Sequence, residues 1–266
     1  MSAGMQLNIK VLLGILSLVS SAEAVGPESL PAFPRSDGPL AVSVLGVPNQ
    51  GGFLPATAVG DARGAWISED GAPGRRLLLG REVRDLAFSA DGALWLATDD
   101  GLHRRDSVGG GSSEHGPAPG AGRVVNALAP TELGTFAGTE AGIHWASATV
   151  TRRLDGVVPH GNATALVWNG GRQILHAVID GRLYAVPIPE GAGGDPASAH
   201  RIVLPPGTGA PIDLAGTAEG VLVLTARGLL SVRGREVHRD APALPAGARP
   251  LRVLADGARV WIAGPR

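Results

Sequence analysis

The chain contains no cysteine, and its only lysine is Lys10. The absence of thiols excludes a disulfide framework, a thiolate zinc site and a cysteine nucleophile, so the fold must be held by packing. Arginine supplies nearly all the positive charge, and the formal net charge is −1. This balance gives no electrostatic reason to expect nucleic acid or an anionic membrane surface as a partner.

Long apolar runs are also missing. No segment approaches the roughly 20 consecutive apolar residues that a membrane-spanning helix needs, so no membrane span is predicted. A shorter run, Val11–Val19, follows Lys10 and precedes the small-x-small sequence Ala22–Ala24, which is the layout of a secretory signal peptide. We expect cleavage after Ala24 and a periplasmic or secreted protein. The predicted division is residues 1–24 signal peptide, 25–38 N-terminal linker and 39–266 folded domain.

Glycine and proline, in contrast, are abundant. The 266 residues include 40 glycines and 21 prolines, and this glycine content is about twice the average, without a Gly-X-Y period. Turns must therefore be frequent and long helices scarce. With 44% apolar residues the chain can still bury a core, so the composition predicts many short strands.

The stretch VRDLAFSADGALWLATDDGLHRRD, Val83–Asp106, places three strand-like runs around a tight turn and an acidic turn. Successive related copies start about 41, 39, 48 and 40 residues apart, near the length of a four-stranded propeller blade. Asp-Gly, Asn-Gly and similar turns between the runs predict hairpins. The related segments begin near Ala56, Val124, Ala163, Pro211 and Leu251.

A large apolar residue recurs near the start of the second strand of each copy. Such a position fits a strand packed between neighbouring sheets, so we expect core packing there rather than an exposed binding tryptophan. The predicted column contains Trp66, Trp95, Phe136, Leu175, Leu222 and Trp261.

These features predict an all-β fold, a single β-propeller of six blades, each a four-stranded antiparallel sheet. The last copy, from Leu251, ends after its second strand. Because a ring must close to remove its sheet edges, we expect an N-terminal strand, Pro39–Gly46, to supply an outer strand to the last blade.

The pattern V-x-x-L-x-x-x-x-D-G-x-L-W-L-x-T-x-D-G-L of Val83–Asp106 resembles the repeat of the two-component-regulator propeller family, found in periplasmic sensor regions of bacterial proteins. The resemblance implies an exported binding or interaction module without catalytic activity of its own. Streptogramin-lyase-like propellers share the DGxLW grammar, so a small-molecule lyase or hydrolase is the alternative. A further alternative is an envelope assembly scaffold.

In a propeller, the turns between second and third strands lie on the same face as the blade-to-blade connections. In this chain those turns are expected at SEDG, TDDG, TEAG, IDG and ARG. They form an acidic mouth that attracts a cation or a basic partner, or they are solvated turn acids. Hard oxygen ligands suit calcium, but no cofactor and no metal ligand set is predicted. The candidate binding residues are Glu69, Asp70, Asp99, Asp100, Glu140 and Asp180.

The familiar catalytic motifs are absent. The seven histidines lack H-x-x-x-H and H-E-x-x-H spacing, and there is no G-x-S-x-G. His103 and His144 occupy equivalent positions in two copies, which repeat ancestry explains and which an acid/base pair would also fit. No catalytic residue is predicted, and the expected partner is a protein or small ligand at the mouth.

Overall fold

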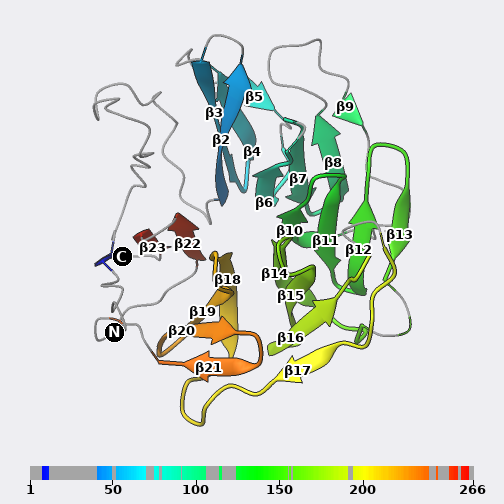
Figure 1. The fold of residues 1–266 in the computed structure, drawn as a ribbon. Coiled ribbons are helices and arrows are strands. Elements are labelled where there is room, and N and C mark those ends of the chain that lie inside the picture. The colour runs from blue at the N-terminus through cyan, green and yellow to red at the C-terminus, as the bar shows by residue number, and fades with distance from the viewer. Residues whose placement is uncertain are drawn as a thin grey trace. The chain divides into compact units, whose positions relative to one another are not determined.

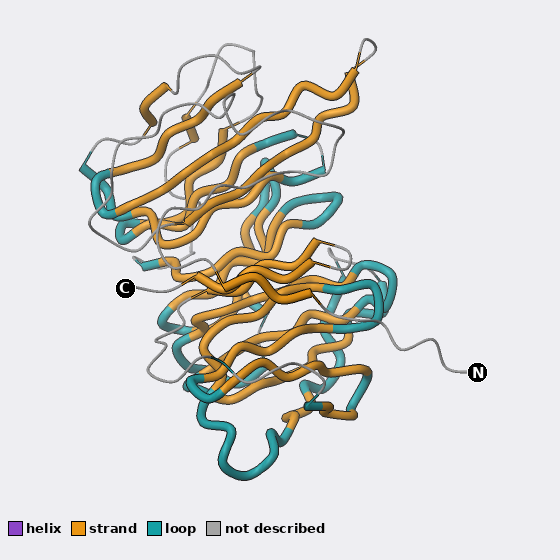
Figure 2. The backbone as a smooth tube through the Cα atoms, turned by 90° about the vertical axis from the view of Figure 1, so that its left-hand side faces the viewer, coloured by secondary structure: helices purple, strands orange, loops and turns teal. Residues whose placement is uncertain are grey.

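A computed structural model of the chain shows strands joined by turns and loops, with no helix among the residues that it describes (Figure 2). In those residues, accordingly, no helix is long and apolar enough to cross a membrane. The predicted all-β class is confirmed. The described residues are 8–11, 41–49, 52–69, 75–77, 80–90, 92–105, 114–115, 124–154, 156, 158–190, 194–239, 244, 252–256 and 259–263.

The chain divides into two compact units. The β2–β13 unit consists of Ser17–Gly156 and His160–Ala163. The β14–β23 unit consists of Met1–Leu16, Val157–Pro159 and Thr164–Arg266. Five of the sheets are antiparallel with their strands in chain order, and the sixth joins β1 to β23 and β22.

The β2–β13 unit contains three four-stranded sheets, β2-β3-β4-β5, β6-β7-β8-β9 and β10-β11-β12-β13 (Figure 1). Each sheet ends in a short outer strand. The strands are β2 Ala41–Asn49, β3 Gly52–Asp61, β4 Gly64–Glu69, β5 Arg75–Leu77, β6 Val83–Phe88, β7 Leu94–Thr98, β8 Gly101–Arg105, β9 Glu114–His115, β10 Val125–Pro130, β11 Thr135–Thr139, β12 Gly142–Ala146 and β13 Thr151–Arg153.

The β14–β23 unit contains the four-stranded sheets β14-β15-β16-β17 and β18-β19-β20-β21, and the three-stranded sheet β1-β23-β22. The strands are β1 Asn8–Val11, β14 Ala163–Asn169, β15 Ile174–Ile179, β16 Arg182–Pro187, β17 His200–Ile202, β18 Pro211–Gly216, β19 Val221–Thr225, β20 Gly228–Arg233, β21 Glu236–His238, β22 Arg252–Asp256 and β23 Arg259–Ala263.

The N-terminal strand of the last sheet differs from the one predicted. An N-terminal strand does join this sheet, but it is β1, which pairs in parallel with β23. The expected segment Pro39–Gly46 is wrong, because β2 pairs antiparallel with β3 from Ala41 to Asn49. Asn49 pairs with Gly52, so β2 and β3 form a local hairpin. Closing this short hairpin costs far less loop-closure entropy than pairing β2 with the last sheet, some 200 residues away.

The first sheet also begins one strand earlier in the chain than the repeat predicted. Trp66 lies on β4, the third strand, and pairs with Arg76 on β5. The second strand is β3, and the turn after it is Ala62–Arg63. The alignment of Trp66 with Trp95 was therefore wrong, because the repeat begins before Ala56, at β2.

Apolar residues pack between successive sheets within each unit. In the β2–β13 unit, Leu86, Leu94 and Leu96 of the β6–β9 sheet pack with residues of the β2–β5 sheet. The opposite face of the same sheet presents Trp95, which is 2% exposed, to the β10–β13 sheet. Phe136, Leu175 and Leu222 are buried as well, so the core prediction for this column is confirmed at these four positions.

A repeated hydroxyl fixes the turns between second and third strands. The hydroxyls of Thr98, Thr139 and Thr225 are hydrogen-bonded to the carbonyls of Gly101, Gly142 and Gly228, at 2.8, 3.0 and 2.8 Å. Each also accepts a bond from the amide two residues on. The three glycines have φ values of 144°, 127° and 154°, a region that L side chains rarely adopt. The pattern T-x-x-G thus builds the turn and leaves its two middle residues free to vary.

Candidate functional site

The turn face of the β2–β13 unit is the end of its sheets where second strands lead into third strands. It comprises the turns 62–63, 99–100 and 140–141. The starts of β6 and β10 lie beside these turns, because Val83 pairs with Thr98 and Val125 with Thr139.

The structure does not place all six predicted acids on such turns. Asp99 and Asp100 form the β7–β8 turn, and Glu140 lies exposed in the β11–β12 turn. Glu69 instead ends β4, beyond the turn of its sheet, because that sheet is framed one strand earlier. Asp70 lies outside the described residues. Asp180 is exposed in the β15–β16 turn of the other unit.

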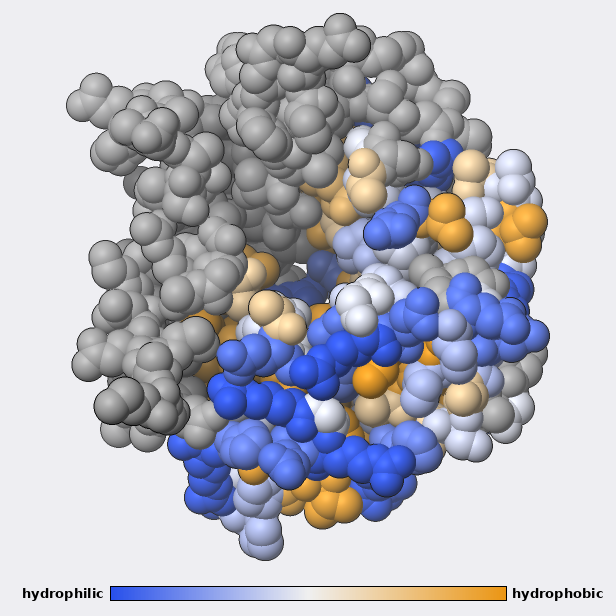
Figure 3. All heavy atoms as spheres, viewed as in Figure 1, coloured by the Kyte–Doolittle hydropathy of each residue, from blue (hydrophilic) through white to orange (hydrophobic). Residues whose placement is uncertain are grey.

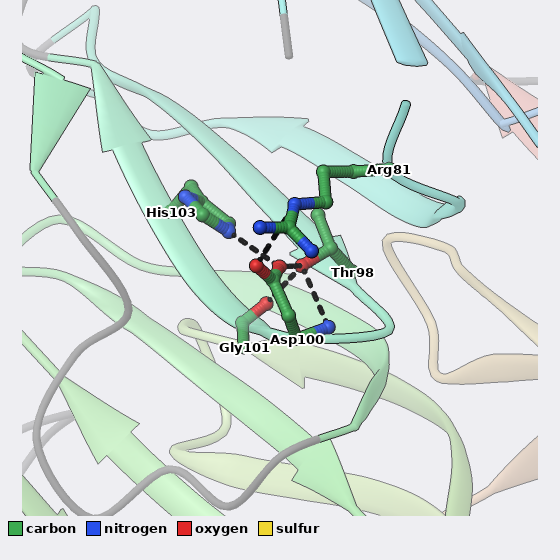
Figure 4. Close-up of polar contacts among 5 residues, drawn as sticks. All are labelled: Arg81, Thr98, Asp100, Gly101 and His103. Carbon is green, nitrogen blue, oxygen red and sulfur yellow. Dashed lines mark hydrogen bonds and ion pairs between the residues drawn. The ribbon is translucent and has the colours of Figure 1, made fainter. Parts of the chain in front are cut away.

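Asp100 is the centre of a polar cluster (Figure 4). Its Oδ1 accepts a hydrogen bond from His103 Nε2 at 3.0 Å. It also lies 2.6 Å from Thr98 Oγ1, whose single proton is shared between this carboxylate and the Gly101 carbonyl. Its Oδ2 lies 3.0 Å from Nε of Arg81, in the segment before β6. Asp100 and His103 side chains are 29% and 12% exposed, so the cluster is half-buried and joins β7, β8 and the preceding connection.

The cluster keeps Asp100 ionised. Partial burial acts to raise the pKa of this carboxyl, but the hydrogen bonds from Thr98 and His103 and the nearby charges of His103 and Arg81 outweigh burial, and the pKa lies below its usual range. Both carboxylate oxygens are occupied by protein donors. Asp100 is therefore held as a fixed negative charge that orients His103 and Arg81.

A second polar network crosses the starts of the inner strands. Arg84 on β6 donates from Nη1 to Asn126 Oδ1 on β10, at 2.9 Å, and its Nη2 lies 3.5 Å from Glu82. Asn126 Nδ2 then donates to Asn162 Oδ1 at 2.8 Å and to the Ala163 carbonyl at 3.3 Å. The network brings amide, guanidinium and carboxylate groups together at one end of the unit.

Sequence reasoning missed Arg81, Arg84, Asn126 and Asn162. A signal was available for two of them, since Arg84 and Asn126 are each the second residue of an inner strand, β6 or β10, and a bulge lies there in both strands. A β-bulge redirects a side chain from the regular alternation. The partners themselves could not be identified from spacing, because Arg84 and Asn126 are 42 residues apart.

The turns do not carry acids alone. Arg63 stands in the β3–β4 turn and Arg227 in the β19–β20 turn, at places where other copies carry Asp100 or an uncharged residue. In the β19–β20 turn the T-x-x-G geometry accounts for this, since it constrains the first and last residues only. In the β3–β4 turn Asp61 stands in the place of the threonine, and its Oδ1 accepts a bond from the Arg63 amide at 2.7 Å. In the part of the chain that the structure describes, no group of three or more His, Asp or Glu side chains is arranged to hold a metal ion.

His103 and His144 hold equivalent places, opposite Leu96 and Ala137 of their neighbouring strands. His103 bonds Asp100, whereas His144 is buried on β12. The two histidines thus occupy the same position on the third strand of their sheets.

No family model matches the chain, and no curated protein matches it. Solved structures do. The β-propeller domain of Cps50 (Swd1) from Myceliophteria thermophila has a TM-score of 0.60 at 15% identity, over 84% of this chain and 76% of that one. Streptogramin B lyase has a TM-score of 0.61 at 13% identity, over 88% and 78%.

A third similar structure is described as the extracellular domain of a one-component system from B. thetaiotaomicron. It has a TM-score of 0.55 at 15% identity, over 78% of this chain and 30% of that one. At sequence identities this low, the functions of these proteins cannot be assigned to this chain. Together with the repeated antiparallel sheets, the three likenesses show that this chain has a β-propeller fold.

Proposed function

We propose that the protein is an exported β-propeller binding module, of the sensor type, which engages a protein or small ligand through the turn face of the β2–β13 unit. The observation that carries the proposal is the Arg84–Asn126–Asn162 network beside the Asp100 cluster. It gathers donors and acceptors from successive sheets at one end, which is how binding sites are built on rigid scaffolds.

At the opposite end of the same sheets, the turns that the structure describes bond mainly within themselves. The Thr131 amide donates to the Gly134 carbonyl at 2.8 Å, and the Ser89 amide to the Ala93 carbonyl at 2.9 Å. The Ser89 hydroxyl is within hydrogen-bond distance of the Ala93 carbonyl and of Trp95 Nε1. These polar groups are used in hydrogen bonds within the turns and to the buried Trp95.

The turn face carries both positive and negative side chains. It therefore favours a partner that has both positive and negative groups over a simple cation. Arg81 and Arg84 stand within hydrogen-bond or ion-pair distance of Asp100 and Glu82. A partner that brings its own paired charges can exchange bonds with these groups without leaving a buried charge unpaired.

Affinity capture with paired variants tests the proposal. The tagged exported protein is used to capture binders from the culture fluid and envelope fraction of the source cells, beside the double variant Arg84→Ala/Asn126→Ala and the control Glu132→Ala. Glu132 is exposed on the opposite turn. We expect a binder retained by the wild type and the control and lost by the double variant; equal capture by all three contradicts the proposal.

The enzyme alternative rests on one observation, the bond between His103 Nε2 and Asp100. A carboxylate that orients an imidazole is a common arrangement for a general base. A screen of small lactones and esters with His103→Gln as the control tests it. Turnover by the wild type that the variant loses would establish an enzyme.

Export is part of the proposal. The predicted leader, residues 1–24, contains β1, so cleavage after Ala24 would leave β23 with β22 as its partner in that sheet. N-terminal sequencing of protein recovered outside the cytoplasm should begin at Val25. Retention of Met1 contradicts cleavage.

A further inference from the structure

Two arginines of the β14–β23 unit converge on one short loop. Residues 205–210 belong to the connection between β17 and β18. Arg227, from the β19–β20 turn, donates through Nη1 to the Gly207 carbonyl at 3.0 Å. Arg239, which directly follows β21, donates through Nη2 to the Pro206 carbonyl, also at 3.0 Å. The two guanidinium groups thus bind the carbonyls of consecutive residues in one loop.

The loop that holds them is fixed in place. The Thr208 amide and hydroxyl both donate to the Pro205 carbonyl, at 3.3 and 2.8 Å, and Thr208 is buried. Gly207 and Gly209 adopt φ values of 80° and 82°. A Cβ atom on Gly209 would lie 3.8 Å from the Ala226 Cβ, so the loop lies against the β19–β20 turn. A site built on it loses little ordering entropy when it binds.

Among the residues that the structure describes, no carboxylate balances the charges of the two arginines. Both residues are exposed, and neither has a carboxylate partner among the described residues. Arg233 in the same unit is different, since its Nε lies 2.9 Å from Glu219. Like charges anchored on one loop repel each other, and one bond to a carbonyl uses only one of the five N–H donors of a guanidinium.

We propose that Arg227 and Arg239, held by the loop 205–210, form a binding site for the carboxylate or phosphate group of a small ligand. Two guanidinium forks present paired N–H donors that match the oxygens of such a group, and the anion removes their repulsion. Hydrophilic side chains gather over β16 to β21 on the face seen in Figure 3. In the T-x-x-G turns, Arg227 holds the place that Asp100 holds in the β7–β8 turn, so this turn recognises the opposite charge from the one predicted. The site does not depend on the partner site of the β2–β13 unit.

Titration of the exported protein with inorganic phosphate and, separately, with acetate tests the proposal, by calorimetry at low ionic strength with sodium chloride as the ionic control. We expect saturable binding of at least one oxyanion, and the tighter of the two identifies the ligand group. R227Q and R239Q should each weaken binding roughly tenfold or more, because each removes a charge-assisted donor set. R233Q, the matched control, should bind as the wild type does.

Arg227→Lys provides a second check, since it keeps the charge and loses the fork. It should bind more weakly than the wild type and more tightly than R227Q. Circular dichroism confirms that each variant is folded. The proposal is overturned if neither oxyanion binds beyond the chloride control, or if R233Q weakens binding as much as R227Q and R239Q do.

Discussion

Asp213 and Val253, 40 residues apart, are joined by a hydrogen bond of 2.8 Å from the Val253 amide to Asp213 Oδ2. The same bond occurs in the other unit, where the Leu128 amide donates to Asp85 Oδ2 at 2.8 Å. In both cases an aspartate just after a bulge in an inner strand satisfies a backbone amide of the next inner strand. The carboxylates thus tie neighbouring sheets together.

Asp213→Ala should lower the free energy of unfolding by about 2–3 kcal/mol, because it leaves a buried amide without its charged acceptor. Asp85→Ala should have a similar effect. Urea denaturation measures both. The control is Glu219→Ala, whose exposed pair with Arg233 should contribute less than about 1 kcal/mol. A loss at Asp213 no larger than that at Glu219 would mean that the bond does not stabilise the fold.

Replacing the turn hydroxyls tests the T-x-x-G motif. Thr98→Val and Thr139→Val keep the side-chain shape and remove bonds at fully buried positions, so each should cost about 1–2 kcal/mol. The double variant should show the sum, since the two turns share no partner. Thr149→Val, on an exposed turn, should change stability by less than about 0.5 kcal/mol. An equal effect at all three positions contradicts the assignment.

His176 should make the protein sensitive to acid. It is buried between the β14–β17 and β18–β21 sheets, opposite Ala185 and on the same face as Val178, and its Nδ1 has no hydrogen-bond partner among the described residues. Burial, together with the charge of Arg172, lowers its pKa from 6.5 to about 4. As the pH falls, the imidazole of His176 is therefore protonated in the unfolded chain before it is protonated in the folded protein. The free energy of unfolding that is present above pH 6.5 is lost as the pH falls towards 4.

Protonation of His176 should lower the free energy of unfolding by about 3 kcal/mol between pH 6.5 and pH 4. Stability measured by urea denaturation at several pH values should decline less steeply between these limits in His176→Leu, which cannot titrate. His200→Leu is the control, since His200 is exposed on β17 and should leave the slope unchanged. Parallel curves for the wild type and His176→Leu would contradict the role of burial.

Calcium should not stabilise the protein. Both oxygens of Asp100 are engaged by Thr98, His103 and Arg81, so a calcium ion at the acidic turns would have to displace a bound guanidinium. Thermal unfolding with millimolar calcium and with EDTA should give the same Tm. A higher Tm in calcium that Asp100→Asn abolishes would restore the cation site that the sequence suggested.

The period, the T-x-x-G turns and the burial of Trp95 and Phe136 could be predicted because they depend on residues close in sequence. The frame of the first sheet could not, since the glycines at the junction of β2 and β3, Gly51 and Gly52, are as typical of a linker as of a hairpin, and only the pairing of Asn49 with Gly52 distinguishes the two. The arginines that lie beside the acidic turns could not be predicted for a related reason. Which cation meets Asp100, and that Arg227 meets Gly207, depends on segments brought together only by folding.

The measurement that tests the central proposal most directly is site-specific photo-crosslinking in living source cells. A photoreactive amino acid is placed at Asp99 or Glu140 on the turn face, and at Glu132 on the opposite turn; all three side chains are exposed. If the protein is a binding module that uses its turn face, the first two positions yield a discrete cross-linked partner and Glu132 yields none. A partner cross-linked from Glu132 alone, or from no position, would contradict it.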